Sequence, residues 1–192
     1  MAELARRVVA HGDGAEFTAT LVTYANFSTA AGHYYSTLAS LPAASVSTAV
    51  LPEVPLDARV ETRILTVIER TLPHLHELLR SLLASPAGVA AFVPDIFGAW
   101  ALEVSVELGV PGYVSCTTNL MALHSIIYIP QCELRDMSEH IRLPGCLRSA
   151  DLVDAVQDRT NPAYPLVVEL ARKYLLADGF IVNTFDAMEH ET

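Results

Sequence analysis

The chain has 192 residues, of which 52% are hydrophobic, and a formal net charge of −10. This length suits one domain that buries a core without the help of disulfides or metals. The acidic balance and the lack of a basic stripe argue against nucleic-acid binding. No apolar run reaches transmembrane length, and the first residues do not form a secretory signal, because they include Glu3 and their apolar stretch is short.

The first part of the chain alternates helical and strand patterns. In chain order, the patterns predict a helix over 3–11, a strand over 17–24, a short helix over 28–38, a strand over 45–50 and a helix over 65–82. The last helix has apolar residues at alternating spacings of three and four, after a predicted cap at Asp57. Pro73 lies inside this pattern, so we expect it to kink the helix or divide it in two.

The segment from Val89 to Val114 predicts a βαβ unit. It contains a buried strand, then Asp95, a helix, a Gly-Val-Pro stop and a second buried strand. A βαβ unit requires a parallel sheet, and ligands bind beyond the carboxyl ends of the strands of such a sheet. Asp95 is expected at that edge, where an acid can take part in chemistry.

The remaining sequence continues the alternation. It predicts a helix over 120–129 that ends at Pro130, an irregular stretch over 131–160 with a short helix at 151–156, a helix from Asn161-Pro162 to Ala177 and a strand over 180–183. The fold class is therefore α/β, with a doubly wound parallel sheet in one domain over 1–192. Such domains normally open on a strand and this one opens on a helix, so we expect the first strand and its loop to be missing.

The three cysteines are Cys116, Cys132 and Cys146. Their odd number and the lack of CxxC spacing favour reduced thiols in a cytoplasmic protein over disulfides or a zinc site. We expect Cys116, at the end of a predicted strand, to fill the core. His74 and His76 are two residues apart on a helix and so lie on different faces, which predicts surface residues rather than metal ligands.

Six segments in a fixed order carry a family likeness. They are Ala2-Glu-Leu-Ala-Arg-Arg-Val-Val9, Ala19-Thr-Leu-Val-Thr-Tyr24, Asp95-Ile-Phe-Gly98, Glu107-Leu-Gly-Val-Pro111, Leu143-Pro-Gly-Cys146 and Ala177-Asp-Gly-Phe-Ile-Val-Asn-Thr-Phe185. Together they resemble the plant UDP-glycosyltransferases, most of all the branch that includes the hydroquinone glucosyltransferases. The resemblance covers nearly the whole chain and identifies it with the amino-terminal, acceptor-binding half of such a protein.

This resemblance implies the GT-B arrangement, in which two Rossmann-like domains face each other across a cleft. The amino-terminal domain binds a small phenolic or other hydroxylated acceptor, and the carboxyl-terminal domain binds the UDP-sugar. The UDP-sugar is a co-substrate, so no cofactor and no metal is implied. The expected reaction is inverting transfer of glucose from UDP-glucose, in the cytoplasm and in plant secondary metabolism, with no nucleic-acid, membrane or obligate protein partner.

The resemblance also implies a catalytic pair, a histidine after the first strand and an aspartate that hydrogen-bonds it. Such a pair makes chemical sense, because a hydroxyl is a poor nucleophile at neutral pH and needs a base whose charge a carboxylate offsets. Asp95 falls on the position of the aspartate. The histidine and the donor motif have no match in these residues; His11 lies at the far end of its helix, on the order of 15 Å from the expected loop. We therefore expect the chain by itself to be inactive.

Each candidate site residue also fits a plain structural role. Asp95 is predicted as catalytic, but an aspartate between a strand and a helix is often an N-cap. Thr117, Thr118 and Asn119 follow the next strand and are candidate acceptor-binding residues, with a helix cap as the alternative. His124, in the helix that comes after them, is the last candidate, with a packed or partly exposed histidine as the alternative.

Two other functions remain open. One is a non-catalytic remnant that binds a small molecule or takes part in an interaction without transferring sugar. The other is a separate α/β enzyme that uses Asp95 differently, although the sequence has no glycine-rich phosphate loop, GxSxG elbow or metal-ligand spacing. If a strand and a partner domain are missing, we also expect marginal stability and a tendency to associate.

Overall fold

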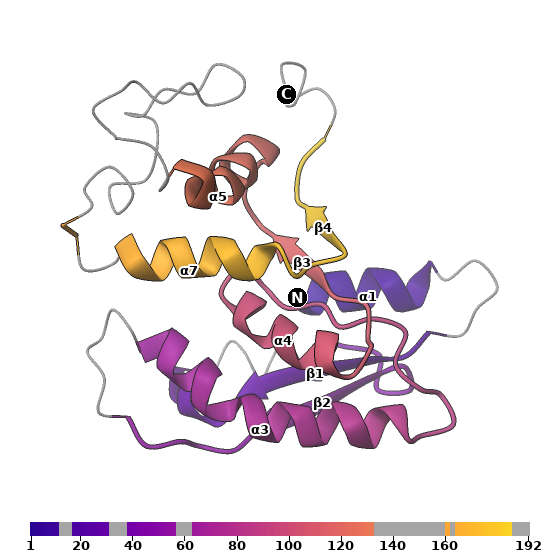
Figure 1. The fold of residues 1–192 in the computed structure, drawn as a ribbon. Helices are drawn as coiled ribbons and strands as arrows, with labels where there is room; N and C mark the ends of the chain where they lie inside the picture. Colours follow the sequence, from indigo (N-terminus) through magenta and orange to yellow (C-terminus); the bar gives the residue numbers. More distant parts are fainter. Residues whose placement is uncertain (12–16, 31–37, 57–62, 133–159, 162–163, 186–192) are drawn as a thin grey trace. The chain divides into compact units, whose positions relative to one another are not determined.

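The computed structural model describes residues 1–11, 17–30, 38–56, 63–132, 160–161 and 164–185 (Figure 1). Contacts divide the chain into two compact units, Met1–Glu77 and Leu78–Thr192. The single domain expected over 1–192 stays a prediction. The cap at Asp57 and the short helix at 151–156 lie outside the described residues, as does Cys146.

The first unit contains a pair of parallel strands. β1 (Ala19–Tyr24) runs parallel to β2 (Val46–Leu51). The first residues of the two strands lie opposite each other, and so do the last. α1 (Ala2–Ala10) contacts both strands. The sequence patterns predicted these three elements to within a few residues. Most of the helix expected over 28–38 lies outside the described residues: its first residues belong to η1 (Ala25–Ala30), a 3-10 helix, and Leu38 is helical.

Asn26 connects the chain after β1 with the chain after β2. Its Nδ2 donates to the carbonyl oxygen of Val54 at 2.9 Å, and its Oδ1 accepts from the N–H of Val54 at 3.0 Å. Both residues are buried. The side chain therefore supplies the partners that these buried backbone groups require, where no strand ladder provides them.

α3 (Arg63–Leu83) is one helix with Pro73 inside it, so Pro73 does not divide it, and the kink expected as the alternative stays a prediction. A proline leaves the carbonyl four residues earlier without its N–H donor, here the carbonyl of Glu69. Both Pro73 and Glu69 are exposed, and an exposed carbonyl can be hydrated. The predicted apolar seam is confirmed by the buried side chains of the helix, Val67, Ile68, Leu75 and Leu79.

The second unit contains the helix and the second strand of the expected βαβ unit. η3 (Gly98–Ala101) leads into α4 (Leu102–Glu107), and β3 (Tyr113–Cys116) pairs in parallel with β4 (Gly179–Val182). α5 (Leu120–Cys132) packs against α7 (Tyr164–Tyr174), which also contacts η3 (Figure 1). α5 continues past Pro130, so the predicted end there is wrong: the proline removes one backbone hydrogen bond, and the last turn forms without it.

The strand predicted before Asp95 is present only as two isolated parallel bridges, Phe92 to Gly112 and Asp95 to Ser115. The carbonyl oxygen of Phe92 accepts a hydrogen bond from the N–H of Tyr113 at 2.9 Å, and the carbonyl oxygen of Pro94 accepts one from the N–H of Ser115 at 2.8 Å. In this register, the N–H of residue 94 would face the carbonyl of Tyr113, but proline has none. The ladder is interrupted at Pro94 for that reason.

The main core of the second unit lies between β3, η3, α5 and α7. It consists of Ala99, Leu102, Val114, Cys116, Leu123 and Tyr174. Cys116 is 2% exposed and free, as predicted for a core filler. No helix within the described ranges is long and apolar enough to cross a membrane.

Candidate functional site

Asp95 lies where the paired segment 92–95 gives way to η3. Its Oδ1 accepts hydrogen bonds from the backbone N–H groups of Phe97 at 3.1 Å and Gly98 at 2.7 Å. The residue is exposed, and Oδ2 accepts no hydrogen bond from any residue that the structure describes. One carboxylate oxygen is thus fixed by the turn, while the other is open to a further donor. The capping role and a catalytic role are compatible.

Gly98 allows the turn to close on Asp95. A Cβ at this position would lie 2.9 Å from Cβ of Pro94 and 3.2 Å from Oδ1 of Asp95. Real side chains do not approach a neighbouring Cβ so closely, so a larger residue would displace the carboxylate from its N–H donors. The signal for this role in the sequence is a glycine three residues after the acid.

Tyr174, on α7, reaches the same turn from the core. Its hydroxyl donates to the carbonyl oxygen of Ile96 at 3.1 Å, and its ring meets Phe180 edge-on with centroids 6.0 Å apart. Burial, followed by the charges of Cys116 and Asp95, raises the pKa of Tyr174. The phenol therefore stays protonated and remains a donor. Sequence reasoning missed this residue, since no local pattern links it to Asp95.

The three polar residues after β3 have different surroundings. Asn119 accepts from the N–H of Ala122 at 2.8 Å through its Oδ1, so it caps the first turn of α5. Thr117 is exposed and Thr118 is half-buried, and neither hydroxyl bonds to another residue of the described ranges. The helix cap left open by the sequence is thus made by Asn119, which leaves the two threonine hydroxyls available.

Strand pairing brings several of these residues to one edge. The bridge between Asp95 and Ser115 places the acid beside the end of β3, directly before Thr117. The N–H of Asn183, which follows β4, donates to the carbonyl of Cys116 at 2.9 Å. Polar side chains therefore follow three neighbouring parallel segments at their carboxyl ends, which is where ligands bind in α/β folds. Asn183 was not among the predicted site residues.

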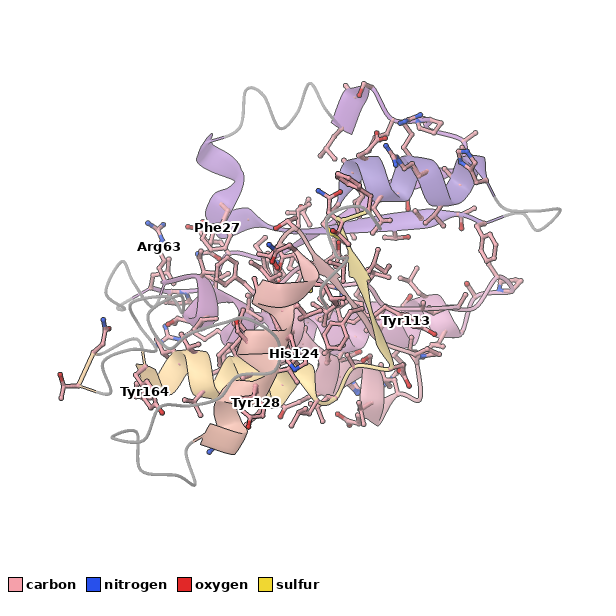
Figure 2. The ribbon with its side chains drawn as sticks, turned by 90° about the horizontal axis from the view of Figure 1, so that it is seen from above. Phe27, Arg63, Tyr113, His124, Tyr128 and Tyr164 are labelled. Carbon is pink, nitrogen blue, oxygen red and sulfur yellow. The ribbon has the colours of Figure 1, made fainter. Side chains whose placement is uncertain are left out.

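His124 is exposed on α5 (Figure 2). No hydrogen bond or ion pair between described residues joins it to Asp95 or to the threonines, so its place in the site stays a prediction. His74 is exposed as predicted, whereas His76 is half-buried, with Nδ1 4.0 Å from Oε1 of Glu77. Among the described residues there is no cluster of side chains that could hold a metal ion.

Solved structures show which fold this arrangement belongs to. The chain is similar to Phytolacca americana UGT2 complexed with UDP-2fluoro-glucose and pterostilbene, with a TM-score of 0.81 and 32% identity over 99% of this chain and 45% of that chain. It is also similar to a UDP-glucosyltransferase from Polygonum tinctorium capable of glucosylating indoxyl, with a TM-score of 0.78 and 35% identity over 99% of this chain and 44% of that one. The fold is the Rossmann-like amino-terminal half of a GT-B glycosyltransferase.

Curated relatives define the family more closely, although no family model matches the chain. Hydroquinone glucosyltransferase of Rauvolfia serpentina is 38% identical over 167 residues, which are 80% of this chain and 35% of the relative. UDP-glycosyltransferase 72B2 of Arabidopsis thaliana is 35% identical over 200 aligned positions, which cover 97% of this chain and 41% of the relative. The chain belongs to the plant UDP-glycosyltransferases, and it spans about two fifths of the length of these relatives.

Proposed function

We propose that residues 1–192 form the acceptor-binding domain of an enzyme that transfers glucose from UDP-glucose to a small phenolic or other hydroxylated acceptor. The observation that carries the proposal is the geometry of Asp95. This acid lies at the carboxyl ends of parallel segments, with Oδ1 fixed by two backbone N–H groups and with no donor to Oδ2 in the described part of the chain. A carboxylate held in this way can orient an imidazole and offset its charge.

The proposed reaction is a single displacement with inversion. A histidine imidazole, hydrogen-bonded to Oδ2 of Asp95, takes the proton of the acceptor hydroxyl. The acceptor oxygen forms a bond to the anomeric carbon as the bond from that carbon to the β-phosphate oxygen breaks, and UDP leaves with the electron pair. The carboxylate of Asp95 stabilises the imidazolium until the proton is released.

Thr117, Thr118, Asn119 and His124 are proposed to line the acceptor site. The support is their place after β3 and on α5, next to the edge that carries Asp95. The UDP-sugar is a co-substrate in this scheme, so no cofactor is proposed. A cytoplasmic location is proposed because Cys116 is a free thiol in the core.

A chimera tests this function. The 192 residues replace the segment of Phytolacca americana UGT2 that matches them, and everything outside the match is kept from that protein. We expect the purified chimera to transfer glucose from UDP-glucose to pterostilbene or a simpler phenol, measured by chromatography of the glucoside. We expect Asp95→Asn to lower kcat on the order of a hundredfold or more, because a neutral amide cannot offset the imidazolium charge.

The matched control is Asp178→Asn. Asp178 is also an exposed acid in the second unit, but its Oδ2 accepts from the N–H of Gly112 at 2.8 Å, before β3 and β4 begin. This variant should keep kcat within about twofold. A chimera that is stabilised by the phenol without forming glucoside would favour the binding remnant. Full activity of Asp95→Asn would refute the proposed role of this residue.

A further inference from the structure

One peptide group joins Tyr174 to Asp95. The carbonyl oxygen of Ile96 accepts from the Tyr174 hydroxyl at 3.1 Å, and the N–H of Phe97 donates to Oδ1 of Asp95 at 3.1 Å. This carbonyl and this N–H belong to the same planar unit, the peptide bond between Ile96 and Phe97. The described chain has no cis peptide bond, so the two groups point in opposite directions. The peptide unit is therefore hydrogen-bonded to a phenol on one edge and to a carboxylate on the other.

This arrangement restricts the turn in a way that the cap alone does not. The cap fixes the carboxylate relative to the turn, but a peptide plane that is held on one edge can still rotate about its flanking bonds. A hydrogen bond on the opposite edge opposes that rotation. A donor on the carbonyl also polarises the peptide and strengthens the bond that its N–H makes to the acid.

Core packing does not by itself account for a tyrosine at this position. Tyr174 belongs to the buried cluster that includes Leu102 and Val114, its ring meets Phe180 edge-on, and a phenylalanine ring would fill the same space. A buried hydroxyl costs stability unless it is hydrogen-bonded, and its partner is the carbonyl of Ile96.

We propose that Tyr174 is a positioning residue of the glycosyl-transfer site: its hydroxyl, acting through the Ile96–Phe97 peptide, fixes the carboxylate of Asp95 in the orientation that holds the catalytic imidazole. This rests on the proposed function, because it assigns Asp95 the role given there. Tyr174 does not touch substrate in this scheme. Its effect reaches the reaction only through the turn.

The test on the full 192-residue chain compares Tyr174→Phe with Tyr164→Phe by NMR. Tyr164 is the first residue of the same helix and is also buried, but it belongs to a separate cluster with Val168 and Ala171. We expect three-bond couplings to show one side-chain rotamer for Asp95 in the unaltered chain and in the Tyr164 variant. In Tyr174→Phe we expect averaged couplings, and exchange of the Phe97 amide about fivefold faster.

The capped amide of Ala122 provides an internal reference in the same spectra, because its acceptor is Asn119 rather than Asp95. A general loosening of the second unit would accelerate both amides and would change the spectrum of the Tyr164 variant too. A change confined to Phe97 and Asp95 supports the proposal. An unchanged Asp95 rotamer in Tyr174→Phe overturns it.

The chimera connects the geometry to the reaction. We expect Tyr174→Phe to lower kcat about tenfold while KM for the phenol stays within twofold, since the acceptor site is left intact. If Asp95→Asn is inactive but Tyr174→Phe keeps full kcat, the positioning role is wrong and the proposed function stands. If Asp95→Asn is fully active, the proposed function fails and the positioning role fails with it.

Discussion

Asp95 caps the turn through its hydrogen bonds and also carries a negative charge. Two substitutions separate these two properties. Asparagine keeps an oxygen that accepts hydrogen bonds, so Asp95→Asn should retain the bonds from Phe97 and Gly98. Alanine has no acceptor, so Asp95→Ala should lose both. The two variants differ in the cap and share the loss of charge.

The structure sets the size of the expected effects. Loss of a capping side chain costs about 1 kcal/mol, within a range of roughly 0.5 to 2 kcal/mol. The bonds to Asp95 are 3.1 and 2.7 Å long, and the acid is exposed, so we expect Asp95→Ala to lose about 1 to 1.5 kcal/mol. Asparagine caps as well as aspartate, so Asp95→Asn should stay within about 0.5 kcal/mol of the unaltered chain.

Urea unfolding of the 192-residue chain, followed by circular dichroism, measures these differences. The midpoint should fall for Asp95→Ala and stay nearly constant for Asp95→Asn, with equal slopes. In the chimera, both variants should lose activity to a similar degree, because both lack the charge. Equal destabilisation by alanine and asparagine would refute the cap, and recovery of activity in Asp95→Asn alone would show that the cap, not the charge, supports catalysis.

Three further predictions concern other parts of the chain. Asn26→Ala removes both partners of the buried Val54 backbone and should cost about 2 to 4 kcal/mol in urea unfolding; a loss below about 1 kcal/mol would contradict this. Gly112→Ala places a Cβ 2.6 Å from Cδ2 of the fully buried Leu102. We therefore expect a cost of about 1 to 3 kcal/mol and a lower melting temperature. An unchanged melting temperature would show that α4 shifts freely to make room. On α1, the pKa of Glu3 is lowered to about 2 by Arg6 and Arg7, chiefly through hydrogen bonds. Because this folded-state pKa is depressed, the stability it contributes is present above the unfolded value of 4.5 and is lost as the pH falls toward 2; NMR titration should show the pKa of this exposed carboxyl rise in about 1 M salt, and no rise would argue against ion pairing.

Local pattern predicted the order of elements well, because the spacing of apolar residues depends on the element that they belong to. β1, β2, β3 and β4 all lie within a few residues of their predicted positions. The effects of prolines are harder to predict from the sequence. Pro73 and Pro130 lie inside helices, while Pro94 interrupts the pairing of a predicted strand. The effect of a proline depends on what its missing N–H would have faced, and that is set by the fold.

The candidate site was predicted only in part for a similar reason. Asp95 stands out in the sequence because it comes between a buried strand and a helix, and Asn119 because it precedes one. Tyr174 is 78 residues away from Ile96, and it looks like any apolar residue of an amphipathic helix. Its link to the turn depends on the packing of α7, which no spacing in the sequence records.

The interruption at Pro94 has a consequence for how this family member can change over evolution. The segment that carries the acid has lost one rung of the ladder to β3, and it gains a bond from Tyr174 on α7 instead. Its alignment is therefore set by a helix as well as by the sheet. Substitutions that shift α7 by a fraction of a turn can therefore move the turn of Asp95 while Thr117, Thr118 and Asn119 are all kept.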